Sequence, residues 1–177
     1  MNDYIEGFPE AGRKKERISK FNAASIIGIP LAAILFQVSV ARTFHYLSYL
    51  DLSLLVTIYF SLMRRSPIEG VLFGAGIGLA QDSLSRGYVG MYGIVKTLVG
   101  YFAASVSQRF DVQNPWVRLV LGFFFYFFHQ FFYWVLKRAL LGETLDFDLE
   151  QTLVVGILNA AVAVPLFRTL DKLKVTG

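Results

Sequence analysis

Long blocks of apolar residues limit the folds open to this chain more than any other feature of its sequence. A membrane-spanning α-helix needs about 20 mostly apolar residues to cross a hydrocarbon core about 30 Å thick. Several blocks in the 177-residue chain reach or approach that length. Apolar residues make up 55% of the chain and charged residues only 17%, so too little polar surface remains to cover these blocks in water. We therefore expect a polytopic helical membrane protein.

The composition excludes several other classes of protein. The chain has no cysteine, which excludes a disulfide-stapled secreted domain and a zinc site built on thiolates. Its net charge is +4, but the basic residues lie mostly at the ends of apolar blocks. That distribution indicates membrane topology rather than a surface for nucleic acid. We expect no cleaved signal peptide, because the first 20 residues are polar and the apolar run after them is long enough to span.

The apolar pattern predicts an all-α domain of six transmembrane helices over residues 21–172. A basic segment, residues 1–20, precedes this domain, and a short tail, residues 173–177, follows it. The third helix is short and rich in glycine, and it begins at Pro67, where a proline removes no needed hydrogen-bond donor. A tight polar link that contains Gly87 follows it. The predicted spans are residues 21–41, 47–63, 67–81, 89–107, 116–136 and 151–170.

The lysines and arginines of the short links predict the orientation of the bundle. With a cytoplasmic N-terminus, twelve of these cations lie on the inner side and four on the outer side, and Lys96 stays within the membrane. The inner twelve include Arg118, near the start of the fifth predicted span, and the outer four include Arg42 and Arg86. We therefore expect both termini in the cytoplasm. The links are short, so we expect no extracytoplasmic domain.

Small residues form a regular pattern in the third predicted helix. Gly70, Gly74 and Gly78 follow one another at steps of four, which places them on one helix face. Such a groove lets another backbone approach closely, either from a helix of the same bundle or from the transmembrane helix of a partner. Both alternatives stay open. The same list of packing or partner-binding candidates includes Gly100, Phe124 and Phe128.

Lys96 is the most informative single residue, because an ammonium group inside a membrane is costly and marks a functional site by default. Asp51 and Asp82 lie near the same predicted end of the bundle, within reach of a lysine side chain. We expect Lys96 to pair with one or both carboxylates, and the alternative is that it extends alone to the lipid headgroups. Together with Thr97, these residues form a predicted intramembrane polar cluster.

The fifth predicted helix contains the run FFFYFFHQFFYW, with ten aromatic residues in twelve positions. So many rings cannot all lie inside one bundle, so several should face lipid or a partner. His129 lies within this run, and the other histidine, His45, lies in a distant link, so we expect no metal site. Gln37 and Asn159 are expected to form hydrogen bonds between helices.

Motifs of known enzymes are missing from the sequence. The chain has no GxSxG, HExxH or P-loop motif. An intramembrane aspartyl protease needs two aspartates facing each other at mid-membrane, whereas Asp51 and Asp82 are predicted near the outer ends of their helices. We therefore expect a protein that is not an enzyme and that needs no cofactor.

The third and fourth predicted helices carry a resemblance to a known family. The run GVLFGAGIGLAQD, residues 70–82, is followed by a short turn and then by KTLVGY, residues 96–101. Asp51-Leu52 at the start of the second helix and Arg64-Arg65 at its end add to the pattern. The chain resembles the MreD family of bacterial rod shape-determining membrane proteins over about residues 20–172.

The resemblance implies a non-enzymatic scaffold of the cell-wall elongation machinery in the bacterial inner membrane. Such a protein would bind the bitopic protein MreC and, through it, associate with MreB, RodA and a class B penicillin-binding protein during peptidoglycan synthesis. The family resemblance also implies the six-helix fold of the substrate-binding subunits of energy-coupling-factor transporters. The alternative function is therefore that of a small-molecule, vitamin-type binding subunit of a transporter.

Overall fold

The computed structural model describes residues 20–43, 45–85, 88–144 and 146–175. Within these residues the chain folds into six α-helices, so the predicted all-α fold is confirmed. A short 3₁₀ helix, η1, and a pair of two-residue strands complete the fold. In chain order the elements are β1 (Lys20–Phe21), α1 (Ala23–Thr43), η1 (His45–Tyr49), α2 (Leu52–Arg64), α3 (Pro67–Leu84), α4 (Met91–Ser107), α5 (Pro115–Leu141), α6 (Leu149–Asp171) and β2 (Lys174–Val175).

Local sequence signals set where several helices begin. Pro115 is the first residue of α5, and the side chain of Asn114 accepts a hydrogen bond from the backbone N–H of Trp116 at 2.9 Å. The side chain of Asp148 caps α6 in the same way, through the N–H of Gln151. Each cap satisfies a backbone donor that the first turn of a helix leaves without a partner.

The second helix differs from its prediction. The apolar pattern predicts a continuous helix over residues 47–63, but the chain forms η1 first and then starts α2 at Leu52. The physical reason is Asp51, whose carboxylate accepts a hydrogen bond from the N–H of Leu54 at 2.9 Å and so caps a new helix. The third helix differs at its other end, because α3 continues to Leu84 and so includes Asp82, which the pattern places in a link.

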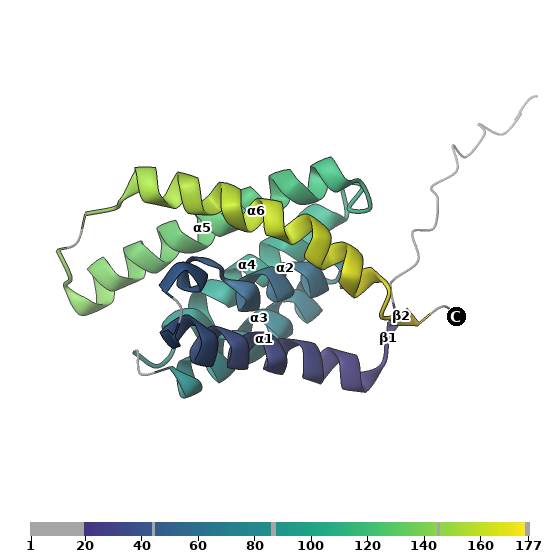
Figure 1. The fold of residues 1–177 in the computed structure, drawn as a ribbon, viewed down its shortest axis with the longest axis horizontal. Helices are drawn as coiled ribbons and strands as arrows, with labels where there is room; N and C mark the ends of the chain where they lie inside the picture. Colours follow the sequence, from purple (N-terminus) through teal and green to yellow (C-terminus); the bar gives the residue numbers. More distant parts are fainter. Residues whose placement is uncertain (1–19, 44, 86–87, 145, 176–177) are drawn as a thin grey trace, which may run out of the picture.

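The core of the bundle is built around α2. Every residue of α2 from Ser53 to Met63 is buried, and α2 contacts each of the other five α-helices. In Figure 1, the paired helices α5 and α6 lie along one side of the molecule and α1 along the opposite side, with the remaining helices between them. A helix that is buried on all faces needs the nearly continuous apolar composition that α2 has.

The two ends of the described chain meet at one end of the bundle. Strands β1 and β2 pair antiparallel, with Lys20 opposite Val175 and Phe21 opposite Lys174 (Figure 1). A chain that enters and leaves a bundle at the same end passes through it an even number of times, in agreement with the prediction of six passes.

Length and composition identify membrane-crossing candidates among the described helices. Three stretches are long and apolar enough to cross a membrane, namely Leu47–Arg64, Pro115–Leu141 and Leu149–Asp171. The apolar stretch Ala23–Ser39 of α1 is shorter. Helices of this length and apolar composition are those of an integral membrane protein.

Some predicted features fall on residues that the structure does not describe. Nearly all of the basic segment, residues 1–20, lies outside the described residues, as do Arg86 and Gly87. The side chains of Arg42 and His45 also lie outside the described part of the molecule.

Candidate functional site

Most of the buried polar side chains of the bundle gather in the half that lies away from β1 and β2. They come from the start of α2, the end of α3, the first half of α4 and the middle of α6, so four helices meet at one place. We call this group the polar cluster, and its members are Asp51, Ser53, Gln81, Asp82, Lys96 and Asn159.

Lys96 lies at the centre of the polar cluster and is completely buried. Its ammonium group is 3.5 Å from the Asp51 carboxylate and also donates to the Ser53 hydroxyl and to the Gln81 side-chain oxygen. A lysine has three N–H donors, so each donor has an acceptor. The buried charge is therefore both paired and fully hydrogen-bonded, as a charge in an apolar interior must be.

Asp82 has a different role from Asp51. Its carboxylate accepts hydrogen bonds from the backbone N–H groups of Gly90 and Gly93, both at 2.9 Å, and of Tyr92 at 3.2 Å. Gly90 precedes α4 with a φ of 97° and has no side chain to cap it, so Asp82 caps α4 from the neighbouring helix. A carboxylate at a helix N-terminus also interacts favourably with the helix dipole. Of the two predicted partners, the structure therefore places Asp51 beside Lys96.

Asn159 and Gln37 bind the backbone where the chain passes from η1 to α2. The side-chain oxygen of Asn159 accepts from the N–H of Asp51 at 2.9 Å, and that of Gln37 accepts from the N–H of Leu52 at 3.0 Å. Asn159 also donates to the carbonyl of Tyr49 at 2.8 Å. These bonds connect α1 and α6 to the break before α2, and they satisfy backbone groups that the break leaves free.

Sequence reasoning missed two members of the polar cluster, Ser53 and Gln81. The hydroxyl of Ser53 donates to Gln81 at 2.6 Å and lies 3.0 Å from Asp51. Both residues are within two positions of a predicted aspartate, which is the signal that could have found them. Thr97 is predicted in the cluster, but its hydroxyl donates to the Gly93 carbonyl of its own helix at 2.6 Å.

The predicted glycine groove is filled by α4. A Cβ atom at Gly70 or Gly74 would overlap the backbone carbonyl of Gly100 or of Lys96, and one at Gly78 would lie 2.7 Å from the Cα of Gly93. The two backbones thus pack directly against each other. Of the two alternatives for this groove, the structure contains the one in which a helix of the same bundle occupies it.

The aromatic side chains of α5 are divided between the surface of the bundle and its interior. Phe124 is half exposed, whereas Phe128 is partly buried and its ring packs against the ring of Phe102 of α4. His129 is buried, and its ring stacks with those of Tyr92 and Tyr133. Among the described residues, neither ring nitrogen of His129 has a hydrogen-bond partner, and no group of three His, Cys, Asp or Glu side chains could hold a metal ion.

A second ionic group, partly buried, lies at the end of the bundle that carries β1 and β2. The Arg118 guanidinium pairs with the Asp171 carboxylate at 2.6 Å, and the same carboxylate accepts from the Tyr59 hydroxyl and pairs with Lys174. From the sequence, Arg118 is counted among the inner-side cations, near the start of the fifth predicted helix. In the structure Arg118 lies in the first turn of α5, only 2% of it is exposed, and its charge is paired inside the protein with that of Asp171.

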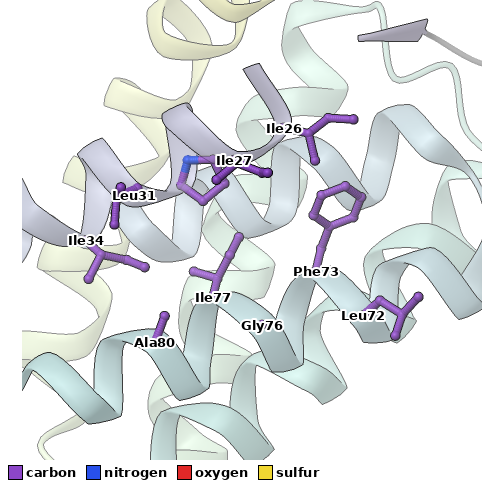
Figure 2. A pocket seen from close by; sticks show the side chains of 10 residues that line it. Ile26, Ile27, Leu31, Ile34, Leu72, Phe73, Gly76, Ile77 and Ala80 are labelled. Carbon is purple, nitrogen blue, oxygen red and sulfur yellow. The ribbon is translucent and has the colours of Figure 1, made fainter. Parts of the chain in front are cut away.

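An apolar groove separates α1 from α3 on the surface of the bundle. It has a volume of about 300 Å³, and Figure 2 shows side chains of the two helices facing each other across it. A Cβ atom added at Gly76, in its wall, would have no neighbour within 4 Å. The groove is lined from α1 by Ile26, Ile27, Pro30, Leu31 and Ile34, and from α3 by Leu72, Phe73, Gly76, Ile77 and Ala80. Sequence reasoning did not predict it.

The polar cluster can fix helices relative to one another, but its polar atoms already bind one another inside the protein. The apolar groove is open to the surroundings of the bundle and offers only dispersion contacts. Neither arrangement combines a nucleophile, a base and an open space for a substrate, so the described residues offer no catalytic constellation.

A family model described as rod shape-determining protein MreD matches residues 19–174, which is nearly the whole chain. No curated protein and no solved structure matches the chain.

Proposed function

Because the chain belongs to the MreD family, whose role is in rod shape determination, we propose that it is a scaffold of the cell-wall elongation machinery. In this proposal the protein binds an MreC-like bitopic membrane protein and has no enzymatic activity. Through that partner it associates with MreB, RodA and a class B penicillin-binding protein. The match to the family model over residues 19–174 is the observation that carries the proposal.

The distribution of polar groups supports a scaffold rather than an enzyme. The longest described links between helices contain only a few residues, so the described protein consists almost entirely of its helical bundle. Its buried charges are satisfied by one another, and its surface carries many large apolar side chains on α1, α3, α5 and α6. Such a surface suits contact with lipid and with the transmembrane helices of partners.

The proposed setting is the inner membrane of a bacterium, with six crossings and both termini in the cytoplasm. The excess of lysine and arginine predicted on the inner side supports this orientation. The antiparallel pairing of β1 with β2 supports it too, because it brings the two ends of the described chain to the same side.

Co-purification tests the proposal directly. The chain and an MreC-like protein are expressed together, extracted in a mild detergent and purified through a tag on the chain, with an unrelated six-helix membrane protein as control. We expect the MreC-like protein to elute with the chain and not with the control. Complete separation of the two proteins would contradict the proposal.

The transporter alternative makes a different prediction. A vitamin-type ligand has polar groups that need polar partners inside a pocket, whereas the groove between α1 and α3 is lined by apolar residues. Co-elution with a transporter ATPase, in place of an MreC-like protein, would favour the alternative.

A further inference from the structure

His129 of α5 is a buried titratable residue whose polar atoms the fold does not use. Only 1% of it is exposed, and among the described residues neither ring nitrogen has a hydrogen-bond partner. A neutral imidazole carries one N–H donor and one acceptor nitrogen, and buried polar groups without partners are uncommon in proteins. The ring stacks on those of Tyr92 and Tyr133, with centroids 6.0 and 6.2 Å away, and a phenylalanine could make the same contacts. Packing therefore does not explain why this position holds a histidine.

The surroundings of His129 are charged. Asp51 and Lys96 both lie close enough to interact electrostatically with the imidazole, and they are paired with each other at 3.5 Å. The two stacked tyrosines are its other titratable neighbours, and α6 contributes the neutral Asn159, which binds the backbone of Asp51. A proton on His129 would add a second buried cation to a site with one carboxylate. An imidazolium is therefore costly in the closed bundle and is stable once water reaches it.

His129 lies where the α5–α6 pair meets the rest of the bundle. The pair runs along one side of the molecule (Figure 1). Near β1 and β2 it is attached to α2 by the hydrogen bond from the Tyr59 hydroxyl to Asp171. Toward the other end it is attached by the ring stack around His129 and by the hydrogen bond between Asn159 and the backbone of Asp51. The imidazole thus belongs to the contact that would separate if the pair moved outward at this end.

We propose that His129 makes this contact acid-sensitive, so that acid opens the bundle between the α5–α6 pair and helices α2 and α4. In the closed state the neutral imidazole is stacked and dry. In the open state water reaches it, and the lone pair of its unprotonated ring nitrogen binds a proton. The proton comes from the side of the membrane away from the chain ends, which is outside the cytoplasm in the proposed topology.

Proton linkage gives the size of the effect. A histidine in water gains its proton at about pH 6.5. When only the open state binds the proton, the ratio of open to closed protein rises about tenfold for each pH unit below that value. Between about pH 8 and about pH 5 the open state should therefore become about thirtyfold more populated.

Hydrogen–deuterium exchange at the backbone amide of Asp51 reports the opening, because this N–H is bound to Asn159 across the contact. Exchange is measured at about pH 8 and about pH 5 for the wild-type chain, His129→Phe and His45→Gln, all in nanodiscs of one lipid composition. His45 is the other histidine of the chain and serves as the control. At each pH every variant is compared with the wild type, so the pH dependence of the exchange chemistry itself cancels.

The ratio of wild-type to His129→Phe exchange should rise about tenfold or more on acidification. The ratio of wild-type to His45→Gln exchange should stay constant. His129→Gln, which keeps a polar side chain that cannot be charged, should behave like His129→Phe. A constant ratio for His129→Phe would overturn the proposal, as would wild-type acid sensitivity in His129→Gln.

The wild-type chain also contains an internal comparison. Residues 70–78 lie in the close contact between α3 and α4, which the opening leaves intact, so their amides should show no acid-dependent rise beyond the exchange chemistry. An equal rise at these amides and at Asp51 would indicate general destabilisation and would overturn the proposal even where both His129 variants fail to fold. All these measurements use the chain without a partner, so their failure leaves the proposed scaffold function intact.

Discussion

At the scale of single residues, the ammonium group of Lys96 shows how the bundle accommodates a charge. All three of its donors are used by Asp51, Ser53 and Gln81. Removing one member of a buried ion pair leaves the other charge without compensation, whereas removing both can be nearly neutral. The energetic importance of this pair is therefore best measured with single and double variants.

Lys96→Met should destabilise the protein by about 3–5 kcal/mol, because it leaves the Asp51 carboxylate buried and unpaired. The double variant Lys96→Met with Asp51→Asn should recover most of that loss, since the asparagine can still cap α2 through the N–H of Leu54. Thermal unfolding of the detergent-purified proteins measures both effects. The control is Thr97→Val, which removes a hydroxyl that binds only its own helix. Strictly additive effects of the two substitutions would show that Lys96 and Asp51 are not coupled.

Asp82→Ala should weaken the start of α4 by about 1–2 kcal/mol, the usual cost of losing a helix cap. The carboxylate accepts three backbone hydrogen bonds, so the amides of Gly90, Tyr92 and Gly93 should exchange faster with deuterium. Asp82→Asn should have a smaller effect because it keeps one acceptor oxygen. Unchanged exchange at these amides would contradict the capping role.

At the scale of elements, the two faces of α3 have opposite properties. One face presents Gly70, Gly74 and Gly78 to the backbone of α4, and the other presents Gly76 to the open groove. Glycine therefore has two separate structural roles in α3. On one face it allows the backbone of α4 to approach closely, and on the other face it leaves a space unfilled. Spacing alone does not distinguish them.

Gly74→Leu should prevent correct folding, because even its Cβ would overlap the backbone of α4, which cannot move aside. Gly76→Leu, only two residues away, should fold normally. Fluorescence-detected size-exclusion chromatography of the two variants measures the difference. A symmetrical main peak for Gly74→Leu, with wild-type thermal stability, would show that α3 and α4 do not pack as closely as the structure indicates.

Much of the element pattern could be predicted from the apolar blocks, and the exceptions have local causes. The positions of α1, α3 and α4 differ from the predicted spans by three residues or fewer at each end. The first residue of α2 could not be predicted from hydropathy, because the hydrogen bond from the N–H of Leu54 to the Asp51 side chain determines where this helix begins. The burial of Arg118 was missed because its partner, Asp171, is 53 residues away in the sequence. The groove was missed because it depends on the separation of two helices.

At the scale of the whole molecule, the fold brings residues near both termini to one end of a bundle organised around α2. The two ionic groups lie toward opposite ends of this bundle, a buried one around Lys96 and a partly buried one around Asp171. Each joins helices that are distant in the sequence. This arrangement is suited to a protein that offers rigid outer faces to lipid and partners.

Reporter fusions should place both termini on the cytoplasmic side of the membrane. Alkaline phosphatase, which is active only outside the cytoplasm, should be inactive when fused to either terminus, and green fluorescent protein should be fluorescent at both. A phosphatase fusion in the link between α5 and α6 provides the positive control. Activity at the C-terminus alone would require an odd number of crossings and would contradict the six-helix topology.

The antiparallel pairing of β1 with β2 has a consequence for engineering the chain. Because Lys20 lies opposite Val175, a short peptide can connect these positions, and new ends can be opened in the link between α5 and α6 without changing the order of helices in space. Such a circular permutant would carry its tags or fused domains on the opposite face of the membrane while keeping the same bundle.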